Sequence, residues 1–138
     1  MITIACIIIL TYAAAFHFYW GFGGQLGISI SVPQNEDGQP AFTKTAIGAH
    51  LVGLVLMSVV FLILAFTGYV NSPAPQEYLK FVVGTLSFAF TARAFSWHKY
   101  VGFFKSIRKT KFGKYDTWQY SPLCLLLGLG LFYVCVKT

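Results

Sequence analysis

Long stretches without charged side chains alternate with short polar segments along this chain. Residues 1–22 contain no acidic or basic side chain apart from His17, and residues 45–76 contain none apart from His50. A helix of about 20 apolar residues crosses a bilayer core about 30 Å thick. The pattern therefore predicts four membrane-spanning helices, at about residues 1–22, 47–70, 80–99 and 117–136.

The segments between these stretches have the composition of loops. Residues 21–44 are rich in glycine and serine, but the glycine spacing is not that of a dinucleotide-binding motif, so we expect a surface or re-entrant segment. Pro73 and Pro75 are expected to end the second helix. No basic residue precedes the first apolar stretch, which favours a retained helix over a cleaved signal peptide.

The composition agrees with this pattern. Hydrophobic residues make up 57% of the 138 residues and charged residues only 10%, whereas a soluble domain carries about 25% charged residues. So few charges cannot cover a core of this size in water. The sequence thus predicts an all-α fold, an integral membrane bundle of four helices that forms one domain over residues 1–138.

The net charge of +6 is concentrated in one connection. Residues 93–116 hold seven bases and one acid, whereas the rest of the chain holds three bases and three acids. Because basic residues next to membrane spans favour the cytoplasmic side, this connection is expected in the cytoplasm. Both termini are then expected on the other side of the membrane, outside the cytoplasm.

A basic segment between two spans lies closest to the phosphates of a lipid surface. We therefore expect anionic membrane lipids as partners and no nucleic acid. A second copy of the chain, or another membrane protein, stays open as a further partner.

Candidate functional residues gather at the cytoplasmic leaflet of the predicted bundle. His17 and Trp20 are three residues apart and share a helical face near the end of the first span. Arg93 precedes the end of the third span, and Asp116 and Tyr120 open the fourth. Among these, His17 is the candidate acid or base for catalysis.

Arg93 is the most informative of these residues. An arginine in a spanning helix costs about 2.5–3.5 kcal/mol at the bilayer centre and less near the interface. It either extends its guanidinium to its own headgroups, or faces inward, where it pairs with Asp116 or holds an anionic ligand.

Residues 100–109 mix aromatic and basic side chains, including Lys105 and Arg108. Such a segment suits the membrane interface, with rings at the acyl boundary and charges among the phosphates. It is either a topological anchor or a binding site for a phosphorylated lipid.

Metal and cofactor chemistry have little support in the sequence. The three histidines lack the spacing of a metal site, and the three cysteines lie in apolar stretches without a C-x-x-C motif. We expect no metal, no cofactor and no nucleophilic triad.

Several blocks together resemble a known family. They are residues 17–24 (His-Phe-Tyr-Trp-Gly-Phe-Gly-Gly), Arg93, residues 100–105 (Tyr-Val-Gly-Phe-Phe-Lys) and residues 120–123 (Tyr-Ser-Pro-Leu). In these blocks the chain resembles an uncharacterised family of small bacterial membrane proteins, domain of unknown function 3995. The resemblance covers about residues 17–123 and implies a short four-span protein, without implying an activity. Together with the expected orientation, it predicts a location in a bacterial inner membrane, with both termini outside.

Two functional hypotheses follow. The first is a small membrane protein that binds anionic lipid headgroups at its cytoplasmic face. The alternative is a small membrane enzyme or transporter subunit acting on a lipid-phosphate or amphiphilic substrate. The alternative requires His17 and Arg93 to face one cavity.

Overall fold

The computed structural model describes all of residues 1–138 and is entirely helical, which confirms the predicted all-α class. Four long helices form the body of the molecule: α1 (Ile2–Gly21), α2 (Ala46–Phe66), α3 (Gln76–Ala94) and α5 (Ser121–Lys137). The short elements are the 3-10 turn η1 (Ile28–Ile30), α4 (Lys111–Tyr115) and a π-helical turn, η2 (Asp116–Tyr120), which joins α4 to α5.

Local sequence signals set where the helices begin and end. The hydroxyl of Thr45 accepts a hydrogen bond from the backbone N–H of Gly48 and caps α2, and Thr110 caps α4 in the same way through Gly113. Beyond the end of α2, Gly68 adopts a positive φ of 81°. Pro75 stands immediately before α3, where a missing N–H costs nothing.

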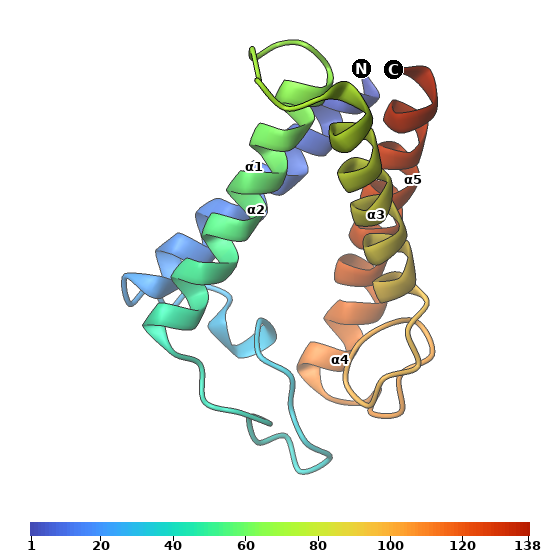
Figure 1. Ribbon diagram of the computed structural model, residues 1–138. Coiled ribbons are helices and arrows are strands. Elements are labelled where there is room, and N and C mark those ends of the chain that lie inside the picture. Colours follow the sequence, from blue (N-terminus) through green and yellow to red (C-terminus); the bar gives the residue numbers. More distant parts are fainter.

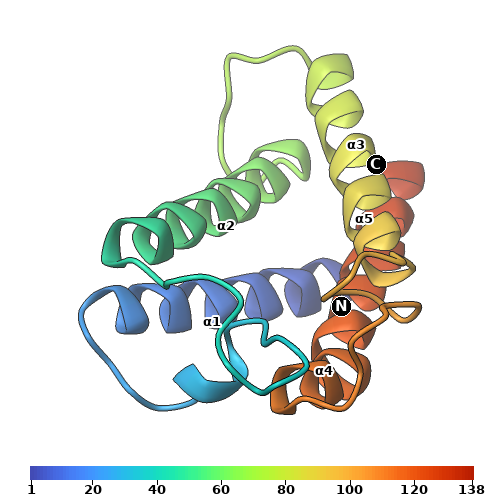
Figure 2. The ribbon, with the colours of Figure 1, turned by 90° about the horizontal axis from the view of Figure 1, so that it is seen from below.

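The long helices form two antiparallel pairs, α1 with α2 and α3 with α5 (Figures 1 and 2). Within the second pair the backbones approach closely at Gly128, where a Cβ atom would lie only 2.2 Å from Thr91 Oγ1. The buried hydroxyl of Ser87 donates to the carbonyl oxygen of Gly128 at 2.7 Å. A small residue on α5 thus lets the two helices meet with a polar contact between them.

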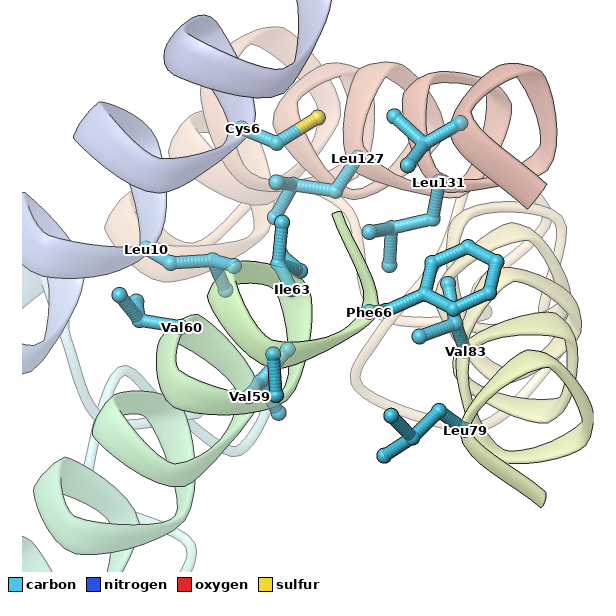
Figure 3. Close-up of a cluster of buried hydrophobic side chains, with 12 residues drawn as sticks. Cys6, Leu10, Val59, Val60, Ile63, Phe66, Leu79, Val83, Leu127 and Leu131 are labelled. Carbon is cyan, nitrogen blue, oxygen red and sulfur yellow. The ribbon is translucent and has the colours of Figure 1, made fainter. Parts of the chain in front are cut away.

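The two pairs meet near the chain termini and diverge toward the opposite end (Figure 1). The apolar core lies at the terminal end, where Cys6 and Leu10 of α1 pack with Ile63 and Phe66 of α2 (Figure 3). Leu131 of α5 joins them, with further core residues from α3 and α5. The opposite end therefore depends on other contacts.

The first connection, residues 22–45, supplies some of those contacts by bridging the diverging helix pairs. The Tyr120 hydroxyl donates to the carbonyl oxygen of Ile30 at 2.9 Å, and the Tyr100 hydroxyl donates to Asn35 Oδ1 at 3.0 Å. The connection is a surface segment with one 3-10 turn. It ties the α1–α2 pair to the α3–α5 pair at the end that lacks the apolar core.

Three helical segments are long and apolar enough to cross a membrane: Ile2–Gly21, Ala46–Phe66 and Lys111–Lys137. The fold is thus that of a helical membrane bundle. Only three of the four predicted spans therefore meet this criterion of length and composition. The bounds of the third were wrong, because α3 runs over Gln76–Ala94 rather than residues 80–99, and α3 is not among the three. Glu77, Lys80 and Arg93 lower its hydropathy.

Candidate functional site

A buried carboxylate holds two bases at the end of the molecule away from the termini. The Asp116 side chain is 0% exposed. Its Oδ1 lies 2.6 Å from Nη2 of Arg93, at the end of α3, and its Oδ2 lies 3.0 Å from Nζ of Lys105, in the connection after α3. The Lys105 side chain is also 0% exposed, and that of Arg93 is 28% exposed. Of the alternatives that the sequence leaves open for Arg93, the structure shows the inward-facing side chain paired with Asp116.

Neighbouring polar groups complete this ion network. The backbone N–H of Gly102 and the hydroxyl of Ser121 both donate to Asp116 Oδ2, at 2.9 and 3.1 Å. Nη1 of Arg93 donates to Ser121 Oγ at 3.0 Å. No buried side-chain nitrogen or oxygen in the protein lacks a hydrogen-bond partner. The network is therefore fully satisfied, and with two bases and one acid it keeps one positive charge.

The π-helical turn η2 explains why the side chains of Asp116 and Ser121 lie side by side. Asp116 begins η2 and Ser121 begins α5, five residues later. A π-helical turn brings residues i and i+5 together, and its hydrogen bond runs from the Ser121 N–H to the Asp116 carbonyl oxygen. The same turn therefore directs both side chains toward Arg93.

Five bases around this network point outward. None of them has an acidic partner, because Asp116 makes the only ion pairs in the protein. Arg108 hydrogen-bonds to the carbonyl oxygens of Phe103 and Lys105 but stays exposed. The exposed bases of this basic surface are Lys99, Arg108, Lys109, Lys111 and Lys114.

Large aromatic side chains are exposed in the same segment. Trp97 is 81% exposed, Phe104 is 58% exposed and Trp118 is 84% exposed. Such side chains are rarely so exposed in water and are enriched at membrane interfaces. Lys105, although grouped by sequence with the exposed bases, instead lies inside the ion network.

A cavity of about 320 Å³ lies between α1 and the η2–α5 junction. Three residues predicted from the sequence line it: His17, Trp20 and Tyr120. Trp20 Nε1 donates to the carbonyl oxygen of Leu26 at 2.7 Å, so the first connection forms one wall of this cavity. Most of the other lining residues are apolar. This space is called the aromatic cavity below.

A second cavity, of about 370 Å³, shares His17 with the first and is lined also by Lys44. The Lys44 ammonium lies 3.7 Å from the centre of the Trp20 ring and donates to Ser31 Oγ at 3.0 Å. Burial lowers the pKa of the Lys44 amine, because the charged form loses hydration. Lys44 was not predicted as a site residue, since a lone lysine in a polar loop carries no distinguishing signal in the sequence.

His17 stands between these two cavities with one ring nitrogen engaged. Its Nδ1 lies 2.8 Å from the carbonyl oxygen of Ala13 and therefore donates to it, while Nε2 makes no hydrogen bond within the protein. Arg93 lines neither cavity. The structure thus divides the predicted residues into an ion network, an exposed basic surface and a cavity group, and it does not bring His17 and Arg93 into one cavity.

Metal chemistry finds no ready site in this arrangement. No group of three or more His, Cys, Asp or Glu side chains is placed to hold a metal ion. The one buried acid, Asp116, is already occupied by Arg93 and Lys105.

Comparison with known proteins gives a family without an activity. The chain belongs to the family described as protein of unknown function (DUF3995), which it matches over residues 10–131. No curated protein and no solved structure matches it. The matched range includes the ion network and both cavities, so these features lie within the family's domain.

Proposed function

We propose that this protein binds anionic phospholipids at the cytoplasmic surface of a bacterial inner membrane, through its basic surface. The observation that carries the proposal is the absence of any acidic partner for the five exposed bases, at the end where exposed aromatic rings gather. The only acid nearby, Asp116, is buried with two other bases. The exposed charges are therefore free to attract an anionic partner from outside the chain.

Lipid phosphate is the counter-charge that fits this surface best. The basic surface precedes and enters Lys111–Lys137, a segment apolar enough to cross the membrane, so it lies at headgroup level. Exposed rings such as Trp97 and Trp118 suit the boundary between acyl chains and headgroups. A nucleic acid would have to approach the same charges past these rings and the lipid surface.

The energy available is consistent with several weak contacts. Each base near an anionic surface contributes about 1 kcal/mol, so five bases together can hold a shell of anionic lipid without any single one being essential. Salt weakens such contacts, because exposed charges are screened. Lipid selectivity should therefore fall as ionic strength rises.

The test compares two charge-matched double variants in nanodiscs of zwitterionic lipid with a small fraction of phosphatidylglycerol. Lys109→Gln with Lys111→Gln removes two charges from the basic surface. Lys80→Gln with Lys137→Gln removes two exposed charges elsewhere, near the start of α3 and at the end of α5. We expect the first pair to lower the enrichment of phosphatidylglycerol around the protein several-fold, up to roughly thirtyfold for the loss of about 2 kcal/mol. The second pair should change it little.

Enrichment that survives in the first double variant would contradict the proposal. Equal losses in both double variants would show an effect of net charge alone, and would also contradict a localised surface. Native mass spectrometry of the released discs measures the lipid bound per protein.

A further inference from the structure

The two cavities that share His17 lie outside the basic surface and need a separate explanation. The aromatic cavity is mostly apolar, with polar groups at few positions. The adjoining cavity contains an unpaired cation, Lys44, with the hydroxyls of Ser31 and Thr43 in its lining. Small-molecule sites have this character, with volumes of about 300–1,000 Å³, apolar walls and few placed polar groups.

The aromatic cavity follows α1 over two turns. Its lining on this helix runs from Trp20, near the helix end, to Tyr12. Eight residues at 1.5 Å each mean that this lining extends about 12 Å along the helix axis. A hydrocarbon chain fits such a space with the orientation that it has in the surrounding leaflet.

The cation lies beside the Trp20 end of the aromatic cavity. Lys44 contacts the ring of Trp20, the residue at the end of the aromatic cavity nearest the first connection. Its ammonium donates to the neutral Ser31 hydroxyl and lies over the Trp20 ring, but it has no acidic partner within the chain. Lys44 is partly buried, so its charge has lost part of its hydration, and an anionic group from a ligand would offset that loss.

We propose that these adjoining cavities bind a single-chain amphiphile with an anionic head, whose hydrocarbon chain occupies the aromatic cavity and whose head pairs with Lys44. The head is a carboxylate or a phosphate, since either can accept hydrogen bonds from an ammonium. Both the fatty acid and the single-chain phospholipid carry this chemistry. The site is distinct from the basic surface and does not depend on the lipid binding proposed for it.

Trp20 offers a direct readout of occupancy. The chain has three tryptophans, and Trp97 and Trp118 lie outside both cavities. In a Trp97→Phe, Trp118→Phe background, the remaining fluorescence comes from Trp20. A brominated chain quenches this fluorescence on contact, so titration in neutral detergent measures binding at the site.

Three probes and matched variants test the two halves of the site. A dibrominated fatty acid and a dibrominated single-chain phosphate should quench Trp20 saturably, more tightly than the uncharged methyl ester of the same acid. Lys44→Gln should weaken the anionic probes about tenfold, as expected for losing a hydrogen bond to a charged group, and should leave the ester little changed. Lys44→Arg should keep the preference for the anion.

A second pair of variants tests the chain half. Ala13→Phe places a ring in the aromatic cavity and should abolish saturable quenching by every probe. Ala5→Phe is the matched control, because Ala5 lines a different cavity near the other end of α1. Lys109→Gln with Lys111→Gln should leave Trp20 quenching unchanged, which separates this site from the basic surface.

Equal quenching in the wild type and in Ala13→Phe would mean that the chains reach Trp20 from the micelle, and would overturn the proposal. If Ala13→Phe does not fold, the Lys44 variants still decide the matter. An anion preference that is absent in the wild type, or that persists in Lys44→Gln, would also overturn it. If the anion preference is present in the wild type and lost in Lys44→Gln, the anionic probe that binds more tightly identifies the head group.

Discussion

Asp116 is the residue on which the polar end of the molecule depends. It is fully buried and neutralises two bases, so Asp116→Asn would leave two positive charges without a counter-charge. Breaking a buried ion pair from one side costs about 3–5 kcal/mol. We expect Asp116→Asn to lower the free energy of unfolding by about that amount, measured by thermal or denaturant unfolding in detergent.

Lys105→Met provides the matched comparison at the same network. It removes the second base and leaves Arg93 and Asp116 as a neutral pair, with the methionine chain filling much of the lysine's space. The loss of stability should therefore be clearly smaller than for Asp116→Asn. A larger loss for Lys105→Met would show that the lysine, and not the acid, organises this end.

Part of this ion network was predictable from the sequence. Arg93 and Asp116 could be paired because each is a rare charge beside a span, and burial makes such charges seek each other. Lys105 could not be distinguished from the other bases of its segment. Only the fold of the turn after α3 selects it, by placing its ammonium against Asp116, Thr117 and the Gly102 carbonyl oxygen.

At the scale of elements, the turn after α3 depends on Gly102. Its φ is +97°, and a Cβ atom there would lie 2.1 Å from the carbonyl oxygen of Ser96. Gly23 has nearly the same φ, +93°, but open space around it. Gly23→Ala should therefore cost only the conformational term, about 1–2 kcal/mol.

Gly102→Ala should cost clearly more, because the turn must also shift and weaken the Gly102 N–H bond to Asp116. Unfolding in detergent measures both variants, and limited proteolysis of residues 95–110 reports the local loosening. Equal losses for the two alanines would mean that the close approach to Ser96 is relieved without cost.

The helices themselves were largely predictable from the sequence. Where their ends differ from the predicted bounds, the difference has a clear structural cause. The predicted span at residues 1–22 matches α1 (Ile2–Gly21), because no Asp, Glu, Lys, Arg, Gly or Pro interrupts it before Gly21. The predicted span at residues 47–70 ends earlier, at Phe66, where the chain turns through Gly68. The last helical segment starts at Lys111 rather than at residue 117, since α4 and the π-helical turn continue into α5.

At the scale of the whole molecule, the sequence did not predict which helices pair with which. Four apolar helices joined by loops can be packed in several ways, and composition does not distinguish among them. Here the α1–α2 and α3–α5 pairs join through a core at the terminal end, and the first connection bridges the other end (Figure 1). That divergence leaves space for the aromatic cavity, which hydropathy alone gives no means to foresee.

The pairing also bears on how often the chain crosses the membrane. Although α3 is less apolar than its neighbours, it runs antiparallel to α5 (Figure 1). The rings of Phe81 and Phe88 on α3 are exposed. A helix packed along a spanning partner, with aromatic rings outward, is expected to lie in the bilayer with it. We therefore expect four crossings, although only three segments qualify by length and composition.

Paired reporters, one active only inside the cytoplasm and one only outside, can test this arrangement. With four crossings and the basic surface inside, a reporter inserted after Lys109 is cytoplasmic, and reporters after Asn71 and after Thr138 are outside. If α3 does not cross, the insertions after Asn71 and Lys109 share one side of the membrane. If the insertions after Asn71 and Lys109 lie on opposite sides but the one after Lys109 is outside, the chain still crosses four times in the reverse orientation. The proposed binding of lipid at the cytoplasmic surface would then be contradicted.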